Sequence, residues 1–165
     1  MKTQVLMLML SVLCTSTVHA DSGRVTQEGD ASQTVYRAAP QNAFKGSEEH
    51  FTGDVRVERL FPANPTAHYS GASVTFQPAA RSAWHLHPAG QHMMVTAGVA
   101  LTGTRDGKIV QFKTGDTVWC PPGLEHWHGA TPDAPMTHLV ITGVLDGKNV
   151  VWKEQVTDEQ YKGHQ

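Results

Sequence analysis

Four side chains of this sequence have the residue types and the spacing of a metal site. His85 and His87 are separated by one residue, so on a β-strand both imidazoles point to the same face. Gln91 follows after a Pro-Ala-Gly turn and can return an amide oxygen to that face, and His126 supplies a third imidazole after a second turn. Three imidazoles and one carbonyl oxygen suit a divalent transition metal and leave positions open for other ligands. An open metal site of this kind does chemistry, whereas a closed one is structural.

The four candidate ligands are all neutral, and this has a chemical consequence. A metal held by them keeps its full +2 charge, which makes it a stronger Lewis acid and lowers the pKa of a bound hydroxyl group. The alternative is that Gln91 only packs against its neighbours and that the site has three histidine ligands. Imidazole and amide donors accept several divalent metals, so these residues do not by themselves specify the metal.

His128 and His138 are the candidate catalytic residues. His128 lies two residues after His126, so on a continuing strand it faces the same interior. His138 lies in the segment 136–142, where the even-numbered positions share one otherwise apolar face. An unpaired polar group in such a row is costly, and an imidazole with a pKa near neutrality suits general acid–base catalysis beside a metal. The alternative for both residues is a buried, hydrogen-bonded histidine that supports the ligands.

Short strands must position these side chains. Alternating or continuous apolar patterns typical of strands occur at 55–61, 72–76, 93–101, 109–112, 117–119 and 136–142. Asp-Gly pairs at 106–107 and 146–147 favour tight hairpins, and there is no long helical pattern. The sequence therefore predicts an all-β sandwich or barrel. The segment 157–160, Thr-Asp-Glu-Gln, has the character of a capping box and predicts one short C-terminal helical turn.

The N-terminus has the pattern of a secretory signal peptide. Lys2 is followed by an apolar stretch and then by a small-residue cleavage site near Ala20. The apolar stretch is too short to span a bilayer as a permanent helix. We therefore expect a signal peptide over 1–20, an N-terminal arm over 21–50 and a single domain over 51–161. The mature protein is expected to be periplasmic or secreted and not membrane-bound.

Charge and cysteine content narrow the possible partners. The formal net charge is −2, from 13 Lys and Arg against 15 Asp and Glu, and no basic face is apparent. This balance argues against nucleic acid and anionic membrane surfaces and leaves a small-molecule substrate as the expected partner. Cys120 is the only cysteine after the expected cleavage site, so no intrachain disulfide can form. We expect it to be a buried, unreactive thiol.

Two strings in the chain resemble the paired motifs of the cupin superfamily. They are His85-x-His87-x3-Gln91-x6-Gly98 and Gly115-x5-Pro121-x-Gly123-x2-His126. Further local strings resemble one subgroup, the bacterial manganese-dependent cupin hydroxynitrile lyases. These strings are Phe51-Thr52-Gly53-x-Val55-Arg56-Val57, Ser70-Gly71-Ala72-Ser73-Val74-Thr75-Phe76, His126-Trp127-His128-Gly129-Ala130, Met136-Thr137-His138 and Val156-Thr157-Asp158-Glu159-Gln160-Tyr161. The similarity runs from about Phe51 to Tyr161.

The resemblance implies a jelly-roll type cupin β-barrel that associates with copies of itself. It implies Mn²⁺, with Fe²⁺ and Zn²⁺ as alternatives, held by the two histidines of the first string together with Gln91 and His126. The histidine that matches His138 is implied to be the base that cleaves a cyanohydrin into aldehyde and cyanide. Those lyases carry a pocket glutamine four residues after this histidine, where the present chain has Thr142.

Two other functions suit the same residues. An oxidase or dioxygenase that uses Fe or Mn and O₂ also needs three histidines, an oxygen ligand and open positions, and its activity would fail without oxygen. A periplasmic protein that binds a metal or ligand without turnover would show ligand-dependent stabilisation and no loss of substrate. A lyase, by contrast, would consume no oxygen and would remain active without it.

Overall fold

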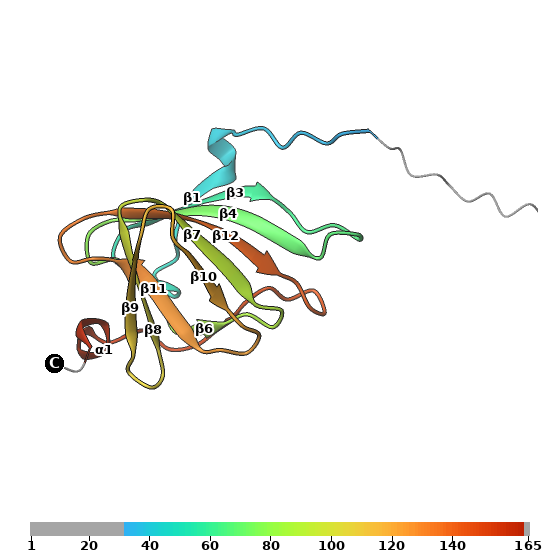
Figure 1. The fold of residues 1–165 in the computed structure, drawn as a ribbon. Helices are drawn as coiled ribbons and strands as arrows, with labels where there is room; N and C mark the ends of the chain where they lie inside the picture. Colours follow the sequence, from blue (N-terminus) through green and yellow to red (C-terminus); the bar gives the residue numbers. More distant parts are fainter. Residues whose placement is uncertain (1–31, 164–165) are drawn as a thin grey trace, which may run out of the picture. The chain divides into compact units, whose positions relative to one another are not determined.

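A computed structural model describes residues 32–163, whose regular structure is almost entirely β (Figure 1). The expected all-β fold with a short C-terminal helix is therefore confirmed. The chain from Val35 onward forms one unit, and the description below concerns that unit. The signal peptide expected over 1–20 and the first part of the arm lie outside the described residues. The signal peptide stays a prediction, as does self-association.

The first sheet contains six antiparallel strands in the order β1-β3-β4-β12-β7-β10 (Figure 1). In that order they are β1 (Ala43–Lys45), β3 (Val55–Phe61), β4 (Tyr69–Phe76), β12 (Met136–Gly143), β7 (Gln91–Ala97) and β10 (Thr117–Cys120). Strand β1 lies within the segment expected to be an arm, where it follows a short 3-10 helix, η1 (Pro40–Asn42). The end of the arm therefore contributes the edge strand of this sheet.

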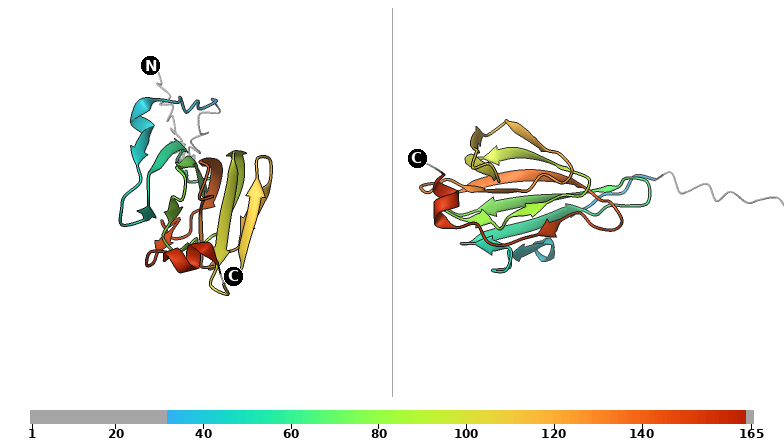
Figure 2. Two further views of the ribbon diagram at one scale, coloured as in Figure 1. Left: turned by 90° about the vertical axis from the view of Figure 1, so that its left-hand side faces the viewer. Right: turned by 90° about the horizontal axis from the view of Figure 1, so that it is seen from below.

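The second sheet contains seven strands, also paired antiparallel. Its main path is β13 (Val151–Trp152), β6 (His85–Leu86), β11 (His126–Ala130), β5 (Arg81–Ser82) and β2 (Phe51–Thr52). Strand β8 (Val99–Thr104) pairs with β11 and with β9 (Ile109–Lys113). The two sheets curl around a shared interior, as Figure 2 shows from two further directions.

Strand β12 shows how the sequence pattern becomes a buried face. Its burial alternates, with Met136, His138, Val140 and Thr142 buried, as the even-numbered positions predict. Because β12 lies between β4 and β7, His138, Val140 and Thr142 each have a neighbour on both sides of the same face. His138, for example, lies opposite Val74 of β4 and Val95 of β7. Together these positions form one wall of the interior.

The single strand expected over 93–101 is wrong. The chain forms two strands there, because Gly98 takes a φ of +77° and separates β7 from β8. The two strands belong to different sheets, so this glycine is the point where the chain crosses from one sheet to the other. A Cβ at Gly98 would lie 2.4 Å from the carbonyl oxygen of Pro135, so a side chain would be excluded as well as strained.

Buried apolar side chains form two clusters. The larger cluster consists of Val55, Val74, Phe76, Ala80, Met93, Val95, Ala100, Phe112, Cys120, Ala130, Met136 and Val140. The smaller cluster consists of Trp84, Trp127, Val156 and Tyr161. Each large side chain removed from water contributes about 1.5–3 kcal/mol, and these contributions offset the entropy lost on folding. Cys120 is buried as expected, and burial raises the pKa of its thiol to about 11.

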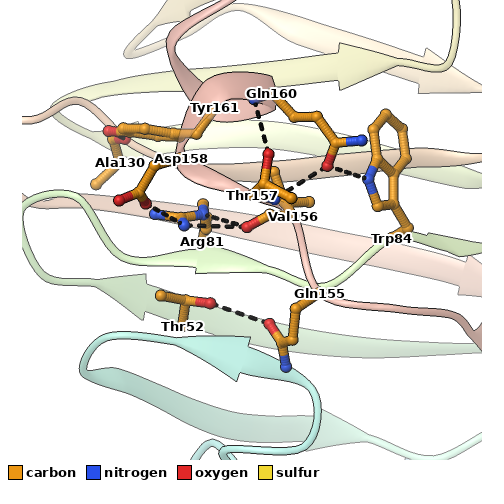
Figure 3. A network of polar contacts seen from close by, with 10 residues as sticks. All are labelled: Thr52, Arg81, Trp84, Ala130, Gln155, Val156, Thr157, Asp158, Gln160 and Tyr161. Atoms are coloured by element: carbon orange, nitrogen blue, oxygen red, sulfur yellow. Dashed lines mark hydrogen bonds and ion pairs between the residues drawn. The ribbon is translucent and has the colours of Figure 1, made fainter.

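The C-terminal segment is fastened to the second sheet by a network of polar contacts (Figure 3). Arg81 of β5 is buried and donates two hydrogen bonds to the carbonyl oxygen of Val156, at 3.1 and 3.0 Å. The same guanidinium pairs with Asp158 at 2.7 Å. Asp158 begins the helix α1 (Asp158–Lys162), whose Tyr161 hydroxyl donates to the carbonyl oxygen of Ala130. The helix therefore holds two strands of the sheet that carries the histidines.

The N-terminus of α1 has the predicted capping box. The Thr157 hydroxyl accepts from the backbone N–H of Gln160, and the Gln160 side chain accepts from the backbone N–H of Thr157. The indole N–H of Trp84 donates to the same Gln160 oxygen at 3.1 Å, which joins the cap to the residue before His85 (Figure 3). Within residues 32–163, no helix is long and apolar enough to cross a membrane.

Candidate metal centre

The predicted ligands come together where β6, β7 and β11 begin or end. His85 lies in β6, His87 lies one residue beyond it, Gln91 is the first residue of β7 and His126 is the first residue of β11. Strands β6 and β11 pair so that His85 lies directly opposite His126, and their ring centroids are 4.4 Å apart. The turn between His87 and Gln91 includes Gly90, whose φ of +78° favours glycine.

Backbone carbonyls fix the tautomer of all three histidines. The Nδ1 atom of His85 lies 2.9 Å from the carbonyl oxygen of Ala83, and the Nδ1 atom of His126 lies 2.9 Å from that of Leu124. The Nδ1 atom of His87 has the carbonyl oxygen of Asn149 as its partner. A carbonyl oxygen only accepts, so each Nδ1 carries the proton and each Nε2 presents a lone pair. This is the arrangement in which proteins orient histidine ligands.

The side-chain amide of Gln91 is held in a similar way. Its Nε2 atom donates a hydrogen bond of 2.9 Å to the hydroxyl oxygen of Thr142, which lies opposite Gln91 on the neighbouring strand β12. Because the nitrogen end of the amide is engaged, the oxygen end is the one left to face the histidines.

Buried polar atoms without a partner test whether these residues fit a metal. Among the described residues, four buried side-chain nitrogen or oxygen atoms lack a hydrogen bond: Nε2 of His87, Oε1 of Gln91, Nε2 of His126 and Nδ1 of His138. Leaving such an atom unsatisfied costs about 1–3 kcal/mol, so each one needs a physical explanation. Three of the four belong to the predicted ligands, and each carries a lone pair. The donor set therefore fits a divalent metal ion, although ligation itself stays a prediction.

Burial keeps the imidazoles neutral. It lowers the pKa of His85 well below its usual value, with smaller contributions from the neighbouring His126 and His87. Burial also lowers the pKa of His87 to about 4 and that of His126 below its usual value. At neutral pH the three rings are uncharged, which is the form that binds a metal.

A second grouping of histidines overlaps the first. The ring nitrogens offered by His85, His126 and His128 all lie within 4.8 Å of one another, so these three could also hold a metal ion. Two observations favour the set with His87 and Gln91. The Nε2 atom of His87 and the Oε1 atom of Gln91 have no other partner. The Nδ1 atom of His128 lies 3.2 Å from Nε2 of His138, and where it accepts that hydrogen bond the proton of His128 is on its Nε2, which then has no lone pair for a metal.

His128 and His138 form a buried pair behind the ligands. Their rings meet edge to face at a centroid distance of 4.8 Å, and Phe76 packs against both. Burial lowers the pKa of His138 to about 4 and lowers that of His128 well below its usual value. The hydrogen bond occupies Nε2 of His138, and its Nδ1 atom is the fourth buried atom without a partner. The structure thus places both candidate catalytic residues together beside the candidate ligands.

A cavity of about 160 Å³ adjoins this group. Its polar lining includes His85, His87, Gln91, His128, His138 and Thr142. Its apolar walls include Val57, Ala72, Val74, Val140 and Trp152. A cavity of this size suits a group about as large as a benzene ring. An apolar hollow with a few convergent polar groups is the usual form of a site for a small organic molecule.

Some residues that shape the site were not found by sequence analysis. The carbonyl groups of Ala83, Leu124 and Asn149 orient the histidines, but a backbone atom leaves no signal in residue identity. Thr142 was noted only as a departure from the related lyases. Its spacing of four residues from His138 places both on the inner face of β12, and that spacing could have revealed its contact with the candidate ligand Gln91.

Comparisons with known proteins agree with this arrangement. Residues 72–142 match the family described as "Cupin domain". The (R)-mandelonitrile lyase of Granulicella tundricola is 50% identical over 128 residues, which are 78% of this chain and 98% of that protein. A solved cupin-like protein from Thermotoga maritima is 37% identical with a TM-score of 0.68, over 72% of this chain and 90% of that one. A solved cupin-2 domain from Rhodospirillum rubrum shares the fold. It is 19% identical with a TM-score of 0.58, over 79% of this chain and 85% of that one.

Proposed function

The chain belongs to the cupin superfamily, and we propose that it is a metal-dependent lyase that cleaves α-hydroxynitriles to an aldehyde and hydrogen cyanide. The observation that carries this proposal is the position of His138. His138 lines the same cavity as three of the candidate ligands, and its Nδ1 atom has no hydrogen-bond partner. The 50% identity to a mandelonitrile lyase supports the same reaction class.

We propose that a divalent metal ion is held by His85, His87, Gln91 and His126. We propose Mn²⁺, with Fe²⁺ or Zn²⁺ as alternatives. When bound, the ion would supply Lewis-acid stabilisation to the substrate's hydroxyl oxygen. The four neutral side chains leave the full charge of the ion available for this purpose. Their tautomers and the amide orientation are set in advance by the protein, so little reorganisation is needed at the moment of reaction.

His138 is the proposed base. Burial keeps its imidazole neutral at pH 7, so Nδ1 can accept the proton of the substrate hydroxyl. In this state Nε2–H donates to Nδ1 of His128, and the hydrogen bond supports the positive charge that develops on His138. As the bond between the hydroxyl carbon and the nitrile carbon breaks, its electron pair leaves with cyanide and the oxygen becomes a carbonyl. His138 then returns the proton to cyanide.

The apolar walls would bind the rest of the substrate and exclude water. Val57, Ala72, Val74 and Val140 present only carbon atoms to the cavity, so an aryl or alkyl substituent is favoured there. Exclusion of water strengthens the electrostatic interactions of the polar groups on the opposite side.

The test is benzaldehyde release from racemic mandelonitrile by the Mn²⁺-loaded protein with oxygen excluded. We expect release that is lost after treatment with a chelator and restored by Mn²⁺. Release only in the presence of oxygen, with oxygen consumed, would indicate an oxidase or dioxygenase instead. No release above the chelated control, together with stabilisation by an added ligand, would indicate a binding protein without turnover.

A further inference from the structure

A groove of about 940 Å³ adjoins the cavity of about 160 Å³ beside the candidate ligands, which we call the metal cavity. The two hollows share four lining residues, namely Val57, Ser70, Ala72 and Asn149, so the groove is the outward continuation of the cavity. Its other walls come from the end of the arm, from the end of β3 with the residues that follow it, and from the loop after β12. These walls include the rings of Tyr36 and Phe61, which lie against each other with centroids 6.4 Å apart.

Arg59 lies on the same face of the sheet as the cavity walls. Side chains alternate along β3, so Arg59 shares its face with Val55 and Val57. The register pairs Arg59 with Ala72, and Ala72 in turn lies opposite Val140 of β12. Neighbouring strands are about 4.8 Å apart, so Arg59 stands about 10 Å across the sheet from the Val140 wall. A substrate that extends across this face from the Val140 wall therefore comes within reach of Arg59.

The Arg59 guanidinium has no carboxylate partner within residues 32–163. It lies over the ring of Phe44, with its central carbon 4.6 Å from the ring centroid. A cation–π contact holds the group in place while it leaves the N–H donors in the guanidinium plane available. Glu58, the residue before Arg59 in β3, points to the opposite face and pairs with Arg56.

The charged residues that line the groove are all positive. Arg37 of the arm lines it as well, and the described lining contains no Asp or Glu. Two cations without counter-charges, at the mouth of an apolar hollow, complement an anion. An arginine fork can donate two parallel hydrogen bonds to the two oxygens of a carboxylate, as it can to a phosphate.

From these observations we propose that the substrate carries a carboxylate, and that Arg59 binds it while the apolar body lies between the metal cavity and the groove. The proposed substrates are therefore aryl α-hydroxynitriles with an acidic substituent far from the reacting carbon. Only the identity of the reacting group rests on the proposed function. Recognition of the carboxylate rests on the groove itself and can be tested without turnover.

The first test measures binding to the Mn²⁺-loaded protein by calorimetry. The probes are 4-(hydroxymethyl)benzoate and, as its uncharged counterpart, benzyl alcohol. We expect the carboxylate probe to bind at least about ten-fold more tightly, as a charge-assisted hydrogen bond implies, and Arg59→Gln to remove that advantage. Arg56→Gln is the matched control, because it removes the same charge from the opposite face of the same strand. Arg59→Lys, which keeps the charge but not the fork, is expected to retain part of the advantage.

The second test compares kcat/KM for 4-carboxymandelonitrile with that for mandelonitrile. Arg59→Gln is expected to lower this ratio about ten-fold, and Arg56→Gln is expected to leave it unchanged. If neither nitrile reacts but the binding of the carboxylate probe still depends on Arg59, the lyase proposal fails and this one stands. If mandelonitrile is cleaved but the carboxylate gives no advantage in either assay, or both arginine variants behave alike, this proposal is overturned.

Discussion

The hydroxyl oxygen of Thr142 accepts a hydrogen bond of 2.9 Å from the side-chain amide nitrogen of Gln91, and both side chains are buried. The contact joins neighbouring strands, because Thr142 of β12 lies directly opposite Gln91 of β7. With the amide nitrogen engaged, the amide oxygen is presented to the histidines. We therefore expect Thr142 to be a positioning residue for the candidate ligand Gln91.

Replacing Thr142 should weaken the metal site. Thr142→Val keeps the shape of the side chain but removes the acceptor, so the amide of Gln91 loses its fixed orientation. We expect Mn²⁺ affinity to fall at least about ten-fold, as is typical when a group that orients a ligand is lost, and Thr142→Ser to retain most of it. Affinity is measured by titration against a competing chelator. Thr137→Val, on the outward face of the same strand, is the control. Equal affinity of Thr142→Val and wild type would contradict the assignment.

The two possible histidine groupings predict different losses of metal binding. If the ligands are His85, His87, Gln91 and His126, His87→Asn should reduce Mn²⁺ binding to the level of a protein without the site. His128→Asn should leave most of the affinity intact, because a His128 whose Nδ1 accepts from His138 carries its proton on Nε2 and has no lone pair for the metal. The measurement is the metal content after gel filtration in buffer with a fixed concentration of free Mn²⁺. The reverse pattern would move the ligand role to His128.

Stability of the metal-free protein should depend on pH through its buried histidines. Burial lowers the pKa of His138 from 6.5 to about 4, so the unfolded chain takes up this proton at a higher pH than the folded protein does. The contribution is fully present above about pH 6.5 and is lost as the pH falls toward 4, by up to about 1.4 kcal/mol per pH unit for each such residue.

Chemical denaturation between pH 7 and pH 4.5, with a chelator present, measures this dependence. We expect the free energy of unfolding to fall with decreasing pH and His138→Asn to reduce the slope by about the amount for one group. The slope is the informative quantity, since the substitution also changes packing at every pH. An unchanged slope would show that His138 is not held neutral by the fold.

The attachment of the C-terminal helix should depend on Arg81 far more than on its acidic partner. Arg81→Met leaves the buried carbonyl oxygen of Val156 without a donor, and we expect a loss of about 1–3 kcal/mol in the free energy of unfolding. Asp158→Asn should cost less than about 1 kcal/mol, because Asp158 is exposed to solvent and a surface ion pair contributes little. Urea denaturation of both variants decides this. Equal losses would show that the ion pair, and not the buried carbonyl, holds the segment.

The parts of this fold that could be predicted from sequence are those with a local period. The spacing of His85 and His87, and the even-numbered face of 136–142, survive into the structure because side chains alternate along any strand. The crossing at Gly98 was missed because the residues on both sides of it are mostly apolar. Local alternation does not reveal which sheet a strand joins, and that choice depends on pairing with residues far along the chain.

The site shows the same division. Residue types and spacing identified the four candidate ligands, but the atoms that orient them could not be found in this way. The carbonyl group that fixes His87 belongs to Asn149, more than sixty positions away, and any residue there would supply a carbonyl. Arg59 was overlooked for a different reason. Arg59 is exposed, as a charged residue near the end of a strand usually is, and only the register with Ala72 shows that it lies on the face of the cavity walls.

Loss of His138 should separate catalysis from metal binding. His138→Asn removes the proposed base but leaves the four candidate ligands and the apolar walls in place. We therefore expect kcat for mandelonitrile cleavage to fall about 10²–10⁴-fold, the usual contribution of a general base, while Mn²⁺ affinity stays close to that of the wild type. His92→Asn is the matched control, because His92 is exposed and points out of the barrel from β7. A kcat for His138→Asn close to that of the control would show that His138 is not the base. The substrate proton would then pass to another group that lines the cavity, and His128 is the first of these to test.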